Sequence, residues 1–251
     1  MSVQLLTRAF SILESLSVAK EGLGVTALAE RTGLSKSTVH RIVTSLVEGG
    51  YVSKNARTGH YELGIKLIEM VSYYINGLEL HTEARPYLRG LTATLNLTTH
   101  LGILEGAEVL YIEKLDIFPN VRLFSQVGFR VPAYCSSLGK CLLSGLSGDE
   151  LDTVLAACDF VQYTERTITD RSVLKHHLVE VRRQGYALED QEQEVGHRCI
   201  GAPIFDYRGE IVAAISASGS TAVLGDERIL PVAEQVKQAA LQVSRRLGYT
   251  G

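Results

Sequence analysis

The sequence predicts an α+β protein with two domains: a small one of three helices and a short hairpin, and a larger α/β one, joined by a single helix. Three observations favour this fold class. Apolar residues recur every three or four positions in the first fifty residues, alternating strand-like segments dominate after residue 97, and a broadly apolar helical segment lies between them. We expect the domains at 1–63 and 80–251, with a linker helix at 64–79.

The composition is that of an ordinary globular protein. The 251 residues are 45% hydrophobic and 21% charged, which leaves room for two modest cores. No apolar run approaches the roughly 20 residues that span a bilayer, and the first residues lack a basic leader and a cleavage site, so we expect a cytoplasmic protein without membrane contact. Four cysteines without CxxC spacing are expected to be reduced thiols.

The charge is unevenly distributed along the chain. Residues 1–62 carry a net charge of +2 and the remainder carries −5, for a total of −3. This mild asymmetry is consistent with a nucleic-acid-binding head on an acidic body, although it also arises by chance.

Two helices are expected first, and the second of them is short. Thr26 stands where an N-cap of the second helix would lie, and Gly33 supplies a left-handed stop. The first helix is predicted from one apolar stripe, which consists of Leu6, Ala9, Phe10, Leu13 and Leu16.

A third helix begins after Ser35, which can cap it, and ends at Gly49. Its turn from the second helix, residues 32–35, has the length of a helix-turn-helix connection. The apolar stripe of this helix is Val39, Ile42, Val43, Leu46 and Val47, and the opposite face and its flanks carry Lys36, Ser37, Thr38, His40, Arg41 and Ser45. Short hydroxyls and cations at a helix start suit phosphates and a guanine edge, so we predict a recognition helix. A solvated helix face is the alternative.

Residues 51–54 and 60–63 alternate like two strands around a turn-rich connection, which predicts a wing. Cations at the hairpin could reach the DNA backbone or the minor groove, although any solvated loop can carry them. The residues expected to contact double-stranded DNA are Thr26, Ser35, Lys36, Ser37, Thr38, His40, Arg41, Ser45, Lys54, Arg57 and His60.

The segment 64–78 has a wider apolar surface than one domain face requires. We expect it to pack against its own head and against a second copy, as in a homodimer that reads two half-sites of a palindromic operator. A core helix of the second domain is the alternative. Its apolar residues are Ile65, Leu67, Ile68, Met70, Val71, Tyr74, Ile75 and Leu78, with a break expected at Gly77.

The larger domain is predicted to be a sheet flanked by helices. The expected strands are 98–104, 109–115, 121–126, 199–205 and 210–218, with a turn at 206–209. Near Leu138 a loop gives way to a helix whose free N-terminal amides attract anions.

The sequence resembles the IclR family of bacterial regulators over essentially its whole length. The motifs that carry the resemblance are 33–41, 99–102, 111–114, 128–132, 136–140 and 192–200. The resemblance implies a GAF-like effector domain and a dimer, or a dimer of dimers. Through 165–169 and 189–194 the chain is most similar to the branch that responds to sugar acids such as 2-keto-3-deoxygluconate. Members that bind glyoxylate or pyruvate share the same framework.

The resemblance also implies an effector-binding pocket. Amides near 137–139 would hold a carboxylate, while Glu189, Ser216 and Ser218 would bond hydroxyl or keto groups. Where Glu189 and Ser137 stand, keto-acid binders of the family often have aspartate and glycine. The implied pocket residues are Leu123, Val131, Ser136, Ser137, Leu138, Gly139, Glu189, His197, Cys199, Ser216 and Ser218.

We therefore expect a DNA-binding transcriptional repressor controlled by a small carboxylate, with no catalytic residue, metal or cofactor. Two alternatives stay open: an enzyme acting on a small carboxylate, and a redox sensor that uses Cys199. We expect His176 and His177 on a solvated helix face, surface pairing for Arg122 and Arg130, and a mainly solvated run of carboxylates over 189–194.

Overall fold

The computed structural model describes residues 2–77, 79–116 and 126–251. The chain divides into two compact units, Met1–Gly77 and Leu78–Gly251, which are described separately. The linker segment falls in the first unit by this division, and the domain bounds 1–63, 64–79 and 80–251 stay a prediction. No helix in the described ranges is both long and apolar enough to cross a membrane.

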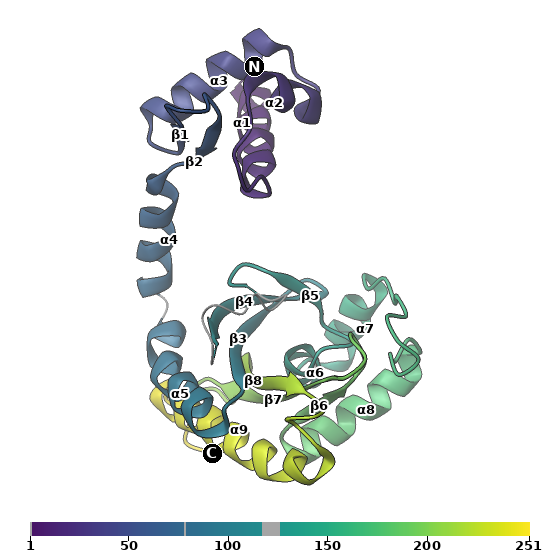
Figure 1. Ribbon diagram of the computed structural model, residues 1–251. Helices are drawn as coiled ribbons and strands as arrows, with labels where there is room; N and C mark the ends of the chain where they lie inside the picture. Colours follow the sequence, from purple (N-terminus) through teal and green to yellow (C-terminus); the bar gives the residue numbers. More distant parts are fainter. Residues whose placement is uncertain (1, 78, 117–125) are drawn as a thin grey trace. The chain divides into compact units, whose positions relative to one another are not determined.

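The first unit is a three-helix domain with a two-stranded hairpin (Figure 1). Its helices are α1 (Ser2–Ser17), α2 (Val25–Thr32) and α3 (Lys36–Glu48), and its antiparallel strands are β1 (Val52–Lys54) and β2 (Tyr61–Leu63). Gly33 ends α2 at φ 68°, a left-handed conformation that suits glycine. The core consists of Ile12, Leu16, Leu28, Val39, Ile42, Val43, Val52 and Tyr61.

The expected stripe of α1 is wrong at two positions. Ile12 is fully buried, whereas Leu6 and Phe10 are 57% and 58% exposed. Apolar residues lie on more than one side of this helix, so spacing alone does not indicate which side meets the core.

The expected cap of α2 is also wrong. Thr26 lies inside the helix and Gly24 occupies the N-cap position. Leu23 pairs with Tyr61 of β2 through two backbone hydrogen bonds of 2.9 Å, and the helix begins two residues earlier than expected.

The linker segment forms α4 (Ile65–Gly77), which ends at the predicted break. Four of its apolar side chains are at least half exposed in the unit: Ile65, Ile68, Met70 and Val71. The side chains of Tyr74, Ile75 and Leu78 lie outside the described residues.

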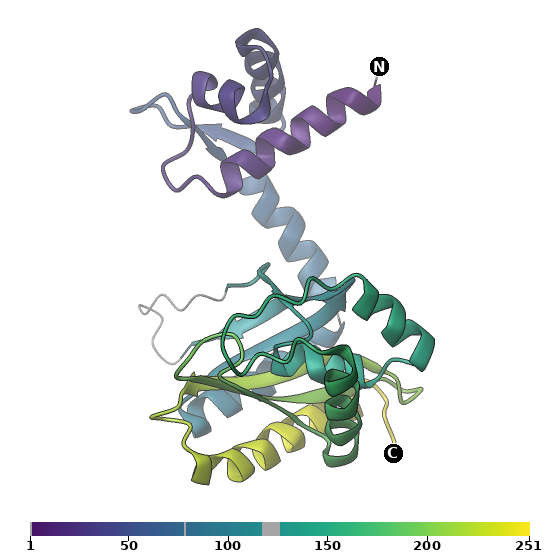
Figure 2. The same cartoon turned by 90° about the vertical axis from the view of Figure 1, so that its right-hand side faces the viewer.

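The second unit is built on an antiparallel sheet of six strands in the order β5-β4-β3-β8-β7-β6. Figures 1 and 2 show α5 and α9 on one face of the sheet and α6, α7 and α8 on the other. The strands are β3 (Thr98–Glu105), β4 (Glu108–Leu115), β5 (Arg130–Pro132), β6 (Ala187–Asp190), β7 (His197–Phe205) and β8 (Ile211–Ser220). The helices are α5 (Glu79–Leu95), α6 (Ser137–Ser144), α7 (Gly148–Ala156), α8 (Arg171–Gln184) and α9 (Asp226–Arg246).

The two faces of the sheet carry separate cores because strand side chains alternate between faces. Ile200, Ala202 and Ile204 of β7 pack with α5 and α9, while Ala214 of β8 packs with the α6 and α8 cluster. The α+β prediction is therefore confirmed.

Four predicted strands are confirmed, as is the turn at 206–209 that joins β7 to β8. The predicted strand 121–126 falls outside the described residues except for Gln126, which is in no strand. The strands β5 and β6 were not predicted, because they have three and four residues and are too short to show a period.

Candidate DNA interface and effector cavity

The helix α3 displays the polar face that the sequence predicts. Ser35 caps it, since its hydroxyl accepts a hydrogen bond from the backbone N–H of Thr38 at 3.3 Å. Lys36 and Arg41 are exposed and form no ion pair with any described residue. No acidic residue lies in the first turn, so the partial positive charge of the helix N-terminus is not offset there.

The other α3 side chains that are predicted to contact DNA differ in their exposure and in the hydrogen bonds they already form. Ser37 and His40 are exposed, and Thr38 is half-buried. The exposed Ser45 donates its hydroxyl to the carbonyl of Arg41 at 3.4 Å, within its own helix. Thr26 lies exposed in the first turn of α2 rather than at its cap.

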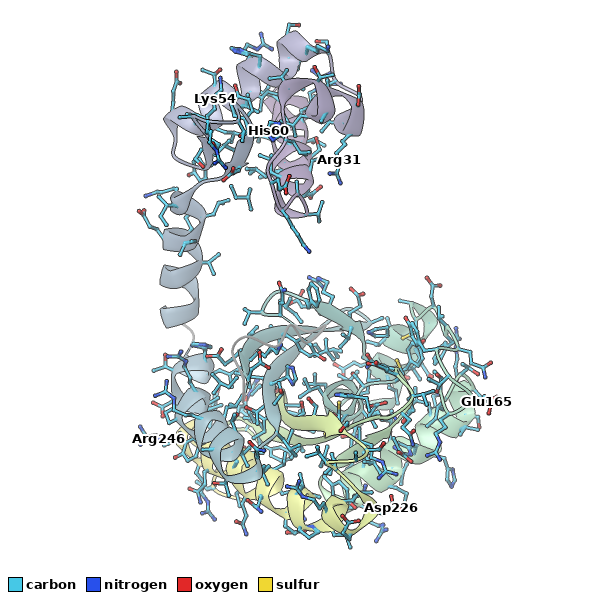
Figure 3. The ribbon with its side chains drawn as sticks, in the orientation of Figure 1. Arg31, Lys54, His60, Glu165, Asp226 and Arg246 are labelled. Atoms are coloured by element: carbon cyan, nitrogen blue, oxygen red, sulfur yellow. The ribbon has the colours of Figure 1, made fainter. Side chains whose placement is uncertain are left out.

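The hairpin β1-β2 carries the three predicted wing residues, of which Figure 3 labels Lys54 and His60. Asn55 braces the tip, because its side chain accepts from the backbone N–H of Arg57 at 3.0 Å. Lys54 lies over the ring of Tyr61 at 5.4 Å, and His60 Nδ1 lies 3.1 Å from the carbonyl of Glu21. Arg57, at the exposed tip, has no such contact with a described residue and is the freest of the three.

The second unit contains a partly open cavity of about 310 Å³ beside the N-terminus of α6. Its lining comes from six strands, from α6 and from the loop between β6 and β7. The lining residues are His100, Tyr111, Phe129, Val131, Ser136, Ser137, Leu138, Glu189, Gln193, Glu194, Val195, Gly196, His197, Cys199, Ser216, Ser218 and Ser220.

The structure brings the predicted pocket residues together around this cavity, with two exceptions. Leu123 lies outside the described residues. Gly139 is not in the lining, because it packs so closely on the backbone of Ala133 that a Cβ would lie 2.2 Å from the carbonyl oxygen. Its N–H donates to the Ser136 hydroxyl at 3.1 Å. Gly139 thus builds the helix start and does not face the cavity.

The N-terminus of α6 is the polar end of the cavity. Ser136 caps it, and the amides of Ser137 and Leu138 precede the first hydrogen bond within the helix. Gly201 of β7 lets the sheet approach this turn, because a Cβ there would lie 3.0 Å from the Ser137 carbonyl. Amides at such a position attract anions.

Glu189 lies on β6 at the other side of the cavity and is 2% exposed. One carboxylate oxygen accepts hydrogen bonds from the backbone N–H groups of Glu192 at 2.5 Å and Gln193 at 3.2 Å. Burial raises the pKa of Glu189 to about 7, against the lowering effect of these two bonds.

A buried ion pair fixes the loop that follows Glu189. Lys140 of α6 is fully buried and pairs with Glu192, which is 5% exposed. The hydroxyl of Thr167 donates to the Glu192 carbonyl at 2.6 Å, and that of Thr164 donates to the Gln191 carbonyl at 2.7 Å. The expected solvation of the carboxylate run is therefore wrong at Glu189 and Glu192. Lys140, a charge within an apolar helical run, was the signal that this loop has a buried partner.

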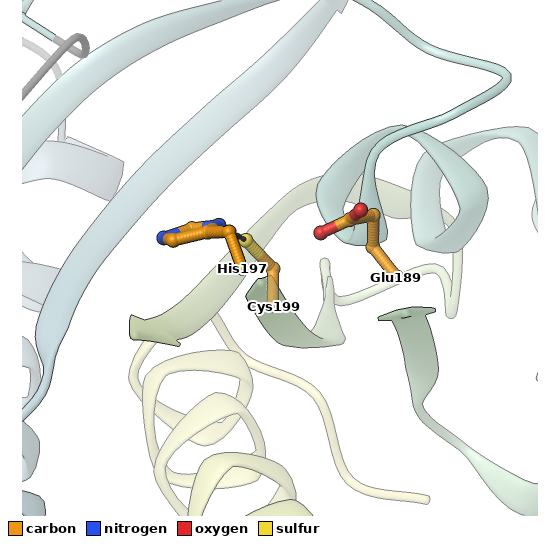
Figure 4. A group of neighbouring side chains, drawn as sticks. All are labelled: Glu189, His197 and Cys199. Atoms are coloured by element: carbon orange, nitrogen blue, oxygen red, sulfur yellow. Dashed lines mark hydrogen bonds between the residues drawn. The ribbon is translucent and has the colours of Figure 1, made fainter. Parts of the chain in front are cut away.

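His197 and Cys199 lie two residues apart on β7, with Cys199 Sγ 3.7 Å from His197 Nδ1. Burial, followed by the charge of Glu189, raises the pKa of the Cys199 thiol well above its ordinary value. A thiol in this state is a poor nucleophile and oxidises slowly, which speaks against the redox alternative. One donor atom from each of Glu189, His197 and Cys199 lies within 4.8 Å of the others, and Figure 4 shows the three converging.

The other expectations about titratable groups have mixed outcomes. His176 is exposed as expected, but His177 is half-buried with an unpartnered Nε2, and burial lowers its pKa to about 4. Arg130 pairs with Glu108 at 3.6 Å on the surface, as expected. Arg122 lies outside the described residues.

Several lining residues were not predicted. His100 and Tyr111 place their rings 4.9 Å apart on β3 and β4, and burial lowers the pKa of His100 to about 3. Gln193 closes the loop over the cavity by donating its side-chain amide to the Cys135 carbonyl at 3.2 Å. Such residues carry no distinctive spacing, and only the fold brings them to the cavity.

Profiles of two known domains match the chain. The one described as the IclR helix-turn-helix domain matches residues 5–56, and the one described as the bacterial transcriptional regulator IclR C-terminal domain matches residues 72–245. The HTH-type transcriptional regulator KdgR of Escherichia coli (strain K12) is 35% identical, over 99% of this chain and 94% of that protein. XynR of the same organism is 34% identical over 98% of each chain.

A solved structure is similar over the same extent. It is an IclR homolog from Microbacterium hydrocarbonoxydans complexed with 4-hydroxybenzoate, with a TM-score of 0.87 at 27% identity over 97% of this chain and 98% of that chain.

These similarities account for the two features described above. A helix-turn-helix domain of this family binds operator DNA, which the exposed cationic face of α3 suits, and the C-terminal domain binds a small-molecule effector, which requires a cavity. The enzyme alternative is wrong, because the relatives are regulators and repressors. The chain therefore belongs to the IclR family of bacterial transcriptional regulators.

Proposed function

We propose that the chain is a cytoplasmic homodimeric repressor that binds a palindromic operator and responds to a small 2-keto or sugar acid. The observation that carries the effector class is the N-terminus of α6, whose free amides of Ser137 and Leu138 lie at a hydroxyl-lined cavity. The cytoplasm follows from the partner, because bacterial operator DNA lies there.

Operator contacts divide into two kinds in this proposal. Arg41, exposed on α3, reads a guanine edge, while Lys36, Ser37, Thr38 and Arg57 hold phosphates. Weaker contacts with the operator come from residues that already form hydrogen bonds or a ring contact within the first unit, or that lie at the edge of this unit. These residues are Thr26, Ser35, His40, Ser45, Lys54 and His60.

Exposed apolar side chains of the first unit support a dimer. Leu6 and Phe10 of α1, with Ile65 and Ile68 of α4, are each at least 57% exposed. A second copy related by a two-fold axis would remove these side chains from water and place two recognition helices on two half-sites. Two such dimers could join on one operator.

The effector in this proposal binds across the cavity. Its carboxylate accepts hydrogen bonds from the Ser137 and Leu138 amides, and its hydroxyl or keto groups meet Glu189, Ser216 and Ser218. Leu123, Val131, His197 and Cys199 complete the proposed site. The homolog that binds 4-hydroxybenzoate supports the class, since that ligand is also a small carboxylate.

A thermal-shift screen tests the effector class. Purified protein is melted with 2-keto-3-deoxygluconate, glyoxylate, pyruvate or 4-hydroxybenzoate, because a ligand that binds only the native state raises the melting temperature. At 100 times Kd the gain is about 2.7 kcal/mol. We expect a shift with one of these acids.

Two variants make the screen specific. Glu189→Ala should abolish the shift, whereas Glu165→Gln, which changes an exposed carboxylate outside the cavity (Figure 3), should keep it. The proposed site is wrong if the shift survives Glu189→Ala, and the proposed ligand class is wrong if no acid shifts the wild type.

A further inference from the structure

The strand β4 changes the direction of its side chains at a β-bulge. Tyr111 is opposite Gly102 of β3, whereas Glu113 is opposite Leu101, so Ile112 has no partner of its own on β3. In a regular strand, side chains two residues apart lie on one face, and Glu113 would then share the cavity face with Tyr111. The bulge instead places Glu113 on the other face of the sheet, where it meets α5.

Glu113 holds the first two turns of α5 against the sheet. It is 8% exposed, and one of its carboxylate oxygens accepts a hydrogen bond from Arg85 Nε at 2.8 Å and lies 3.1 Å from His81 Nε2. The other oxygen accepts from the backbone N–H of Lys114 at 3.0 Å. Because His81 and Arg85 are four residues apart, they lie on one side of the helix and can share this single carboxylate.

Two residues before Glu113, Tyr111 belongs to the wall of the cavity. Its backbone forms two hydrogen bonds with the segment that precedes β5: its N–H donates to the carbonyl of Phe129 at 2.9 Å, and its carbonyl accepts from the N–H of Gly128 at 2.8 Å. Phe129 lines the same cavity. A ligand that displaces either ring therefore acts on the part of β4 that carries Glu113.

The other end of this connection is the start of α5. The helix begins at Glu79, two residues after α4 ends at Gly77. Ala84 and Leu88 are fully buried, so the apolar core holds the middle of α5, while Glu113 supplies polar contacts to its first two turns. A shift of Glu113 thus acts on the end of α5 that follows the linker helix in the chain.

We propose that Glu113 is a positioning residue that couples occupation of the cavity to the linker helix and, through it, to operator binding. A ligand changes operator affinity only if it binds two arrangements of the protein with different affinities. The two arrangements differ here in whether Glu113 contacts both His81 and Arg85. Because the effector cavity belongs to the proposed function, this coupling rests on that function, although it assumes no ligand class.

A double-mutant cycle tests the coupling without an identified effector. Tyr111→Ala changes the cavity wall, and Arg85→Ala removes one partner of Glu113 at a side chain that is 51% exposed, so the fold should be retained. Affinity is measured by fluorescence anisotropy of the full chain with operator DNA selected by the wild type from a random pool. Tyr111→Ala should change the affinity at least about 5-fold in the wild-type background and less than about 2-fold in the Arg85→Ala background.

Two substitutions on α5 provide matched controls. Glu83 pairs with Arg246 of α9 and not with the sheet, and Arg89 is an exposed cation one turn after Arg85. In the Glu83→Gln and Arg89→Ala backgrounds, Tyr111→Ala should keep its full effect on operator affinity.

Glu113→Gln provides a second, independent cycle. It keeps the size of the side chain but removes the charge, and it should reduce the effect of Tyr111→Ala as Arg85→Ala does. A merely structural role for Glu113 would lower the melting temperature of the variant and leave the response of operator affinity to Tyr111→Ala unchanged.

Hydrogen exchange of the full chain locates the change. In Tyr111→Ala, amides of residues 79–88 should exchange faster than in the wild type, whereas amides of residues 171–184 in α8 should exchange at the same rate. Faster exchange in both segments would mean a general loss of stability and would contradict the proposed route.

Two results of the cycle overturn the coupling: equal responses to Tyr111→Ala in the wild-type and Arg85→Ala backgrounds, or an operator affinity that Tyr111→Ala leaves unchanged. Failure of the proposed effector class is a separate result. In that case no acid shifts the melting temperature of the wild type, while the cycle between Tyr111 and Arg85 still shows coupling.

Discussion

The recognition helix and the effector cavity present their functional groups in opposite ways. On α3, Lys36 and Arg41 are exposed, and one helix supplies the whole surface. In the second unit, Glu189 and Lys140 are almost or fully buried, and the cavity draws its lining from strands and a helix up to 120 residues apart.

This difference has an energetic consequence. A side chain that faces only water in the free protein can be replaced with little effect on folding, so its role shows in binding alone. A buried charged group is held by its partners, so its loss affects stability before it affects the ligand. Substitutions of buried and exposed side chains test this separation.

Lys140→Ala should cause the largest loss of stability, about 3–5 kcal/mol in the free energy of unfolding, because it leaves Glu192 buried without its cation. Urea unfolding of the full chain measures it. The exposed pair of Lys175 and Asp152 provides the control, where Lys175→Ala should cost less than about 1 kcal/mol. Equal costs for the two substitutions would contradict the buried-pair assignment.

Arg41→Ala should lower operator affinity by about 1–3 kcal/mol, or about 5- to 150-fold, through loss of a guanine contact. Fluorescence anisotropy with operator DNA measures the affinity. The melting temperature and its shift by the effector should not change. Lys20→Ala removes an exposed cation of the same unit away from α3 and should have a smaller effect; equal losses would mean that Arg41 contributes only net charge.

His177 should make the second unit sensitive to acid. Burial, with the nearby charge of Lys140, lowers its folded pKa to about 4 from an ordinary 6.5, so the unfolded chain binds the proton first as the pH falls. Stability is retained above pH 6.5 and is lost between about 6.5 and 4, by roughly 1–2 kcal/mol for this partly exposed ring.

Comparison of the unfolding free energies of wild type and His177→Gln across this pH range isolates the contribution of the ring. His176→Gln, which changes the exposed neighbour, should leave the pH dependence unaltered. If the unfolding free energies of wild type and His177→Gln change with pH in parallel, the lowered pKa of His177 is contradicted.

Ser35→Ala should have the smallest effect, about 1 kcal/mol in stability of the first unit, because one amide at the start of α3 loses its cap. Thermal unfolding measures it. Ser45→Ala in the same helix removes only a hydroxyl that bonds its own backbone and should change stability by a few tenths of a kcal/mol. A loss of stability for Ser45→Ala as large as that for Ser35→Ala would refute the capping role of Ser35.

The local features of the first unit could be predicted because each depends on neighbours in the chain. Ser35 as a cap and Gly33 as a left-handed stop are confirmed, and Val39, Ile42 and Val43 of the predicted stripe are buried, whereas Val47 is 37% exposed. The errors at Phe10 and Thr26 have one kind of cause, since a distant contact decides which side of α1 is buried and where α2 begins.

The candidate cavity was predicted through family resemblance. The resemblance placed Glu189, His197 and Cys199 in one pocket but assigned no pocket role to Lys140, His100 or Tyr111, although these residues lie within the matching motifs. Spacing cannot reveal such groups, because their partners lie on other strands or helices.

Periodicity and caps act within a few residues, so the helix-turn-helix, the four long strands of the second unit and the polar face of α3 could be predicted from the sequence alone. The burial of Glu192 against Lys140 and the presence of His100 and Tyr111 in the cavity lining became visible only in the folded chain. Burial and charge pairing depend on which segments the fold brings together, and the packing of α6 against β6 and β7 joins parts of the chain about 50 residues apart.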